Sequence, residues 1–228
     1  MKSSAFLQLL ARSAEIYQME VLAYVLMANH FHLLVKTPLA NLQEFMRHFN
    51  ISYTCHFNRA YQRRGHLYQG RYKAFLIDGD PYLPEVSRYI HLNPLRPKEE
   101  AALAMPEKRQ VLRRYRWSSY PTYLSHQAPR SFLQVRDILA YFGGDTLEGR
   151  KKYRIFVEEG LAKKVKNPLE RGKGHGIIGS AKFVERIKEE FLPSSLRSRE
   201  VPAVQRIVGQ VEPERILEAV ATEFKVSQ

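Results

Sequence analysis

The sequence feature that most constrains the fold is a pair of apolar, β-rich segments separated by a short turn. The run "MEVLAYVLM" at 19–27 predicts a strand, "MANH" can reverse the chain, and "HFHLLVKT" at 30–37 predicts a second strand that ends before Pro38. Apolar residues at helical spacing predict a helix on either side of this hairpin, over 4–17 and 42–61.

Further along the chain, "RYKAFLI" at 71–77 predicts a third strand. A helix is expected between Asp80-Pro81 and Asn93-Pro94, and it can begin at Asp80 or only near Pro84. The order over residues 1–93 is therefore α-β-β-α-β-α, which predicts an α+β fold.

The rest of the chain reads as mostly helical, including the segments 180–191 and 212–224. Residues 166–180, "KNPLERGKGHGIIGS", are polar and glycine-rich and are the best candidate for a linker. We therefore expect three parts: an α+β domain over 1–124, a helical extension over 125–165 and a C-terminal helical region over 166–228.

The balance of charge points to a polyanionic partner. The chain has 36 Lys and Arg residues against 23 Asp and Glu, a net charge of +13. Such a surface favours nucleic acid first and an anionic membrane surface second. A single cysteine cannot form an internal disulfide, and no signal peptide or long apolar span is present, so we predict a cytoplasmic protein without a membrane partner.

His30 and His32 are two residues apart at the start of the second predicted strand. Side chains at i and i+2 project from the same face of a strand, so the two imidazoles can hold one cation while Phe31 points to the core. Two imidazoles by themselves suggest a soft ion such as Zn²⁺. Two histidines near a turn also occur by chance, without a metal.

Tyr89 and Asn93 are one helical turn apart and share a face of the predicted helix. A phenol can act as a nucleophile or as an acid-base group, and an amide oxygen can bind a hard metal ion. The alternative is structural: Tyr89 is a half-buried amphipathic residue, and Asn93 caps the helix before proline.

Four segments in this order, "MANHFHLLV", "GHLYQGRYKAFLID", "YLPEVSRYIHLNPLR" and "YRWSSY", closely resemble the REP-associated tyrosine transposases. These belong to the single-tyrosine HUH superfamily. The resemblance implies a ferredoxin-like antiparallel sheet with helices on one face, and a transposase that cuts and rejoins single-stranded DNA at hairpin repeats through a 5′-phosphotyrosine. Tyr89 would be the nucleophile, and His30, His32 and Asn93 would bind Mg²⁺ or Mn²⁺.

A basic segment between the second helix and the third strand fits a DNA substrate. Its candidate DNA-binding residues are Arg63, Arg64, His66, Tyr68, Gln69, Arg71 and Lys73. The cations could hold phosphates, Tyr68 and Tyr72 could stack on bases, and His66 and Gln69 could read base edges. A second basic stretch lies over 108–116. The alternative is a solvated charged surface with packed tyrosines.

Relatives carry a further strand before the first helix, which this sequence lacks, so we expect a sheet without its first strand and with an open edge. The C-terminal region is expected to hold part of a helix-turn-helix-like DNA-binding appendage. The expected assembly is a homodimer. The competing hypothesis is a catalytically inactive or domesticated sequence-specific DNA-binding protein, which needs only the basic surface.

Overall fold

The computed structural model describes residues 3–125, 130–162, 165–174 and 176–191. The chain forms two compact units, of which the larger contains Met1–Lys73 and Leu83–Lys166, and the smaller contains Ala74–Tyr82 and the residues from Asn167 onward. The helix expected over 212–224 lies outside the described residues. Among the described helices, none has the length and apolar character that crossing a membrane requires.

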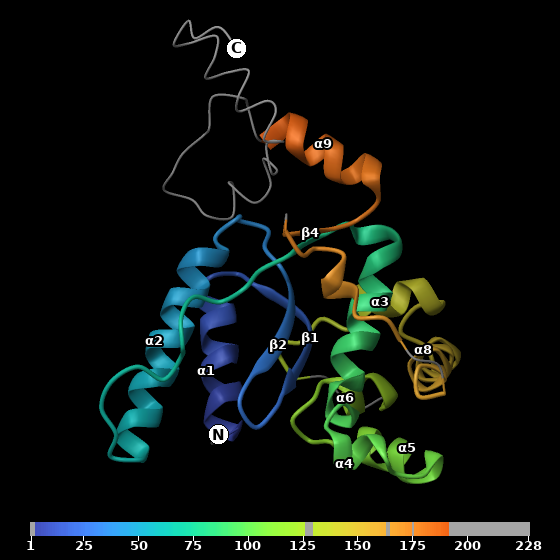
Figure 1. Cartoon of the computed structure of the whole chain (residues 1–228), viewed down its shortest axis with the longest axis horizontal. Helices are drawn as coiled ribbons and strands as arrows, with labels where there is room; N and C mark the ends of the chain where they lie inside the picture. The colour runs from blue at the N-terminus through green and yellow to red at the C-terminus, as the bar shows by residue number, and fades with distance from the viewer. Residues whose placement is uncertain (1–2, 126–129, 163–164, 175, 192–228) are drawn as a thin grey trace, which may run out of the picture. The chain divides into compact units, whose positions relative to one another are not determined.

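The larger unit is built around an antiparallel hairpin of β1 (Glu20–Leu26) and β2 (Phe31–Lys36). Val25 pairs with His32 and Leu26 with Phe31, and the Met27 amide donates a 2.8 Å hydrogen bond to the His30 carbonyl to close the turn. The predicted hairpin is therefore confirmed (Figure 1).

Two helices cover one face of this hairpin, α1 (Ser3–Ile16) and α2 (Leu42–Ala60). Phe6 of α1 contacts both the hairpin and α2. Its ring centroid is 5.0 Å from that of Phe31 in β2 and 4.8 Å from that of Phe49 in α2. These edge-to-face contacts bury aromatic residues from the apolar faces of the two helices, which were the basis of both helix predictions. Figure 1 shows α1 and α2 together on one side of β1 and β2.

The opposite face is covered by α3 (Gly79–Leu92), whose Tyr89 ring contacts His32. The expectation of helices on one face was therefore wrong. The reason lies in β1, which is buried at every position from Val21 to Leu26. A strand that is apolar on both faces requires cover on both, as in a buried parallel strand. Pro84 lies inside α3, so the earlier of the two expected helix starts is the correct one.

The third strand expected over 71–77 is reduced to β3 (Leu76–Ile77), which does not pair with the hairpin. It pairs in parallel with β4 (Ile177–Ile178) in the smaller unit. Residues 71–74 are exposed, so this stretch buries no apolar face that would hold it in the larger sheet.

The edge of β1 that does not face β2 is paired by later parts of the chain. The Leu26 amide donates to the Trp117 carbonyl at 2.9 Å, and the Ser119 amide donates to the Tyr24 carbonyl at 3.0 Å. The Val21 carbonyl accepts from the Gln134 amide at 2.8 Å. These contacts satisfy backbone groups that would otherwise form an exposed edge.

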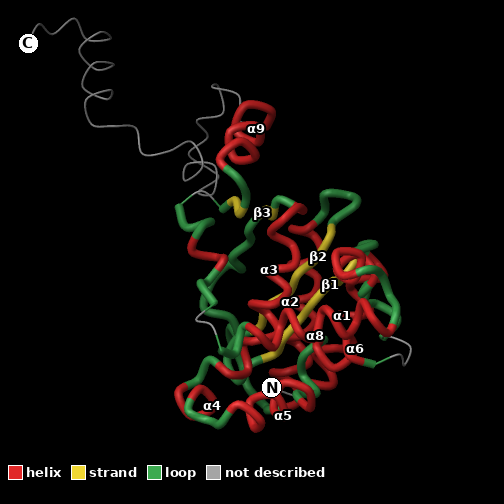
Figure 2. The backbone as a smooth tube through the Cα atoms, turned by 90° about the vertical axis from the view of Figure 1, so that its right-hand side faces the viewer, coloured by secondary structure: helices red, strands yellow, loops and turns green. Residues whose placement is uncertain are grey.

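The remaining elements are mostly short helices, in agreement with the helical character predicted beyond residue 125. They are η1 (Asn93–Leu95), α4 (Lys98–Ala101), α5 (Met105–Arg114), α6 (Tyr120–Leu124), α7 (Arg136–Leu139), η2 (Ala140–Phe142), α8 (Leu147–Glu159), η3 (Pro168–Glu170) and α9 (Ala181–Phe191). In Figure 2 the two strands of the hairpin, drawn in yellow, run side by side. The α+β class is confirmed, whereas the ferredoxin-like arrangement and the three domain boundaries stay predictions. The predicted linker 166–180 contains η3 and β4.

Candidate active site

The two histidines of the hairpin lie side by side. His30 immediately precedes β2 and is exposed, whereas His32 lies within the strand and is half-buried. Their ring centroids are 5.2 Å apart, and Nδ1 of His30 is 2.8 Å from Oδ1 of Asn29. The chain thus brings two imidazoles together at the end of β2, as the spacing predicted.

The surroundings of both imidazoles favour the uncharged form. Burial, followed by the nearby charges of His30 and Arg96, lowers the pKa of His32 to about 4. Burial also lowers the pKa of His30. A neutral imidazole keeps a nitrogen lone pair, so both rings are in the form that binds a cation.

Tyr89 faces this pair from α3. Its side chain is 5% exposed, and its ring centroid lies 5.6 Å from that of His32 with the ring planes at 81°. A phenol on a helix and an imidazole on a strand are therefore in direct contact, although they are 57 positions apart in the sequence (89 − 32).

Asn93 follows one turn after Tyr89 and is buried. Its Nδ2 donates a 2.9 Å hydrogen bond to the Tyr89 carbonyl, so the side chain caps the end of α3, as the structural alternative predicted. This bond fixes the amide nitrogen and leaves Oδ1 as the side-chain atom with lone pairs for a cation.

Arg96 belongs to the same cluster, although neither its residue type nor its position predicted a place there. Its guanidinium carbon lies 4.1 Å from the centroid of the Tyr89 ring, in a cation–π contact. This contact was not predicted, because the helix was expected to end at Asn93-Pro94. The chain instead continues as the 3₁₀ helix η1, with Pro94 in its first turn, and so carries Arg96 back toward Tyr89.

His91 is a second residue that the sequence analysis did not select. It lies on α3 and is fully buried. Its Nε2 is 2.7 Å from Oγ of Ser119, and its Nδ1 is 2.7 Å from the Tyr153 hydroxyl. Burial lowers its pKa to about 3, and the neutral ring can donate to one hydroxyl and accept from the other.

Ser119 connects this network to the hairpin. Its Oγ accepts a 2.9 Å hydrogen bond from the Tyr24 amide in β1. Because β1 pairs with β2, the chain of contacts His91–Ser119–Tyr24 ties the helix that carries Tyr89 to the hairpin that carries His32. His91 therefore positions the two halves of the site.

The two imidazoles are candidate cation donors. Within the residues that the structure describes, no cluster of three or more His, Cys, Asp and Glu side chains could hold a metal ion. The paired rings of His30 and His32 offer nitrogen donors, and Oδ1 of Asn93, one turn after Tyr89, is the predicted third donor.

The basic segment contributes mainly exposed side chains. Arg63, Arg64, His66, Gln69, Arg71 and Lys73 are all exposed, and 62–73 forms neither helix nor strand. Tyr68 contacts the strand of the site: its ring centroid is 6.3 Å from that of Phe31, and its buried hydroxyl has no hydrogen-bond partner. The structure thus places Tyr68 beside β2, whereas the cations of this segment face solvent.

An α+β unit that sets neutral imidazoles against a phenol, in a chain of net charge +13, has the features of a protein that processes DNA. Residues 2–93 match the family model described as "Transposase IS200 like". This segment belongs to that family, so the predicted relationship to single-tyrosine transposases is confirmed over it. No curated protein and no solved structure matches the chain.

Proposed function

We propose that this protein is a transposase that cuts and rejoins single-stranded DNA at hairpin-bearing repeats, with Tyr89 as the nucleophile. The observation that carries the proposal is the contact between the Tyr89 ring and His32, beside His30. The family of residues 2–93 supports a transposase and hence a DNA substrate. The REP-associated subgroup and a homodimeric assembly are part of the proposal.

In the proposed reaction, the Tyr89 oxygen attacks the scissile phosphorus, and the bond from phosphorus to the 3′-oxygen breaks. The phenol loses its proton, and the leaving 3′-oxygen takes one up to become a hydroxyl. The 5′-phosphate remains joined to Tyr89 as a diester. Since one phosphodiester replaces another, a 3′-hydroxyl from a second strand can reverse the step without ATP.

His30, His32 and Asn93 would hold Mg²⁺ or Mn²⁺. When bound, such an ion supplies Lewis-acid stabilisation of the negative charge on the phosphate oxygens. The chain contributes the low pKa of His32, which keeps its lone pair available, and the cap by Asn93, which orients the amide. Phosphoryl chemistry favours these hard ions over the Zn²⁺ that two imidazoles suggest by themselves.

Arg96 would supply a second positive charge to the phosphate. Its guanidinium covers the Tyr89 ring, and its side chain is otherwise exposed. Guanidinium groups bind phosphate oxygens through paired N–H donors, so Arg96 can move from the ring to the scissile phosphate when DNA arrives. The exposed cations of 63–73, with Tyr68 and Tyr72, would hold the strand that leads to the site.

The decisive experiment is Tyr89→Phe in a cleavage assay on hairpin-bearing DNA with Mg²⁺ or Mn²⁺. We expect loss of the covalent protein–DNA adduct with little change in DNA affinity, because only the hydroxyl is removed. Tyr17→Phe, on the α1 side of the hairpin, is the matched control and should keep the adduct. An adduct formed by Tyr89→Phe would refute the assignment. DNA binding by the wild type without any product would favour the DNA-binding alternative.

A further inference from the structure

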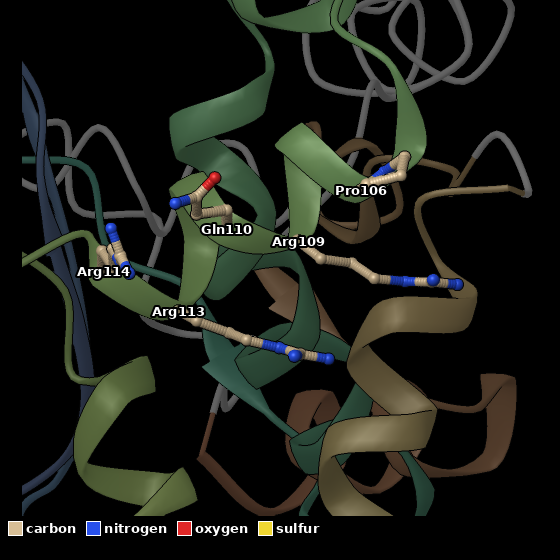
Figure 3. Close-up of a pocket in the computed structure, with 5 residues that line it drawn as sticks. All are labelled: Pro106, Arg109, Gln110, Arg113 and Arg114. Carbon is tan, nitrogen blue, oxygen red and sulfur yellow. The ribbon is translucent and has the colours of Figure 1, made fainter.

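The helix α5 presents a cationic face that the proposed cleavage site does not use. Residues at helical spacing i, i+3, i+4, i+7 and i+8 line a hollow of about 380 Å³: Pro106, Arg109, Gln110, Arg113 and Arg114. None of these lining side chains is a carboxylate. In Figure 3, Arg109 and Arg113 extend in the same direction, while Gln110 and Arg114 point away from them.

A nearly buried carboxylate on α8 holds two of these arginines. Arg113 donates from Nε and Nη2 to the two oxygens of Glu158, at 2.8 Å each, and Nε of Arg109 is 3.6 Å from the same carboxylate. The Glu158 side chain is 10% exposed, and it also accepts a 3.3 Å hydrogen bond from the Tyr120 hydroxyl. The Arg113 guanidinium is therefore held in place, and Arg109 is paired more loosely with the same carboxylate.

This pairing neutralises only part of the charge. One carboxylate faces two guanidiniums, and Nη1 of Arg113 is not used by the bidentate pair. Arg114 makes no ion pair within the part of the chain that the structure describes, and Arg116 lies over the Trp117 ring at 4.4 Å. The face thus keeps a net positive charge and outward N–H donors.

We propose that this face of α5 binds the phosphate backbone of DNA outside the cleavage site, on the same substrate that the proposed function assigns. The planar N–H donors of guanidinium groups match phosphate oxygens. A protein partner would require apolar or aromatic anchors at the centre of its interface, and this face offers a line of cations with one proline. The proposal rests on the proposed function only for the identity of the partner as DNA.

The test is the salt dependence of DNA binding by the full chain, with a hairpin-bearing oligonucleotide as the probe. Arg109→Ala/Arg114→Ala removes two charges and leaves the Arg113–Glu158 pair intact. Arg12→Ala/Arg47→Ala removes two exposed arginines from α1 and α2 as the matched control. We expect the α5 variant to bind more weakly and to reduce the slope of log K against log salt by about 2, since each lost phosphate contact removes about 1.

The outcomes separate this proposal from the proposed function. An unchanged slope and affinity in the α5 variant, or an equal change in the control variant, overturns the α5 site. If the α5 variant shows the expected loss and the wild type forms no tyrosyl adduct, the DNA-binding face stands and the transposase chemistry falls. A melting temperature equal to that of the wild type must accompany the loss, and a conservative Arg109→Lys/Arg114→Lys variant should restore most of the slope.

Discussion

At the scale of single residues, the site is defined by what covers Tyr89. The ring of His32 meets it edge to face, and the guanidinium of Arg96 lies over it, so the side chain is 5% exposed. In the proposed reaction, Arg96 would move aside to let a phosphate reach Tyr89. In the proposed reaction, the cation that shields the phenol is also the one that meets the incoming charge.

Replacing Arg96 should therefore affect the chemical step more than DNA binding. For Arg96→Ala we expect a decrease of about 10²-fold in the rate of adduct formation, since preorganised charge at the reacting group is lost, and Arg96→Lys should recover part of it. Single-turnover cleavage rates measure this. Arg186→Ala, which removes a similar contact with Phe183 in α9, is the control and should leave the rate unchanged.

Replacing His32 tests the proposed cation site directly. For His32→Ala we expect loss of Mn²⁺ binding measured by calorimetry, together with loss of cleavage, because one of three donors is removed. DNA affinity in the presence of EDTA should remain close to that of the wild type. Retained Mn²⁺ affinity in this variant would exclude His32 as a ligand.

The sequence predicted part of this residue arrangement. The spacing of His30 and His32 on a strand, and of Tyr89 and Asn93 on a helix, was enough to place each pair on one face. It could not predict that Arg96 returns to Tyr89, because the turn that continues beyond Pro94 depends on tertiary packing. The choice between cap and ligand for Asn93 was also open, since the amide has one atom suited to each role.

At the scale of elements, α3 is held against the hairpin by polar contacts in the core. His91 joins Ser119 and Tyr153, and Tyr153 is also 3.0 Å from Oγ of Ser87 in α3. All four side chains are buried. A buried network of this kind fixes one packing arrangement, because each group lost removes a hydrogen bond from a buried neighbour.

His91→Phe should therefore destabilise the larger unit. Two buried hydroxyls each lose one hydrogen bond, at a cost of about 1 kcal/mol each, which lowers the melting temperature by about 4–8 °C in a unit of this size. Thermal unfolding followed by circular dichroism measures it. His56→Phe, an exposed histidine on α2, is the matched control and should change the melting temperature by less than about 2 °C.

The elements themselves were the most predictable part of the fold. The hairpin and the helices α1, α2 and α3 follow from local apolar spacing and from proline positions. The prediction of a third strand over 71–77 was wrong in extent and partner, because β-propensity does not specify a partner. Residues 71–74 are exposed, and Leu76–Ile77 pairs with a segment about a hundred positions later. The continuous run of apolar residues in β1 indicates a strand that is packed on both faces by other elements.

At the scale of the whole molecule, the family match ends at residue 93, but residues beyond it also hold the candidate site in place. The edge of β1 forms backbone hydrogen bonds with Trp117, Ser119 and Gln134. The buried ring of His91 forms a hydrogen bond with the Tyr153 hydroxyl. The residues that match the family are therefore one part of a larger cooperative structure.

A fragment of residues 1–93 should fail to fold on its own. We expect it to lack a cooperative thermal transition, because the β1 edge and the pocket of His91 would be exposed to water. A fragment of residues 1–166 keeps every contact of the larger unit described above and should show the transition. Circular dichroism melts of both fragments check this, and a cooperative melt of 1–93 would show that the later helices are dispensable.

This dependence of β1 on residues 117–134 has a consequence for how such genes are read. An open reading frame interrupted after the asparagine-proline pair would still encode both histidines and the tyrosine, yet its product would have no scaffold to bring them together. Motif searches across a genome would then overestimate the number of competent copies, and the downstream helices would be the better criterion for sorting intact copies from relics.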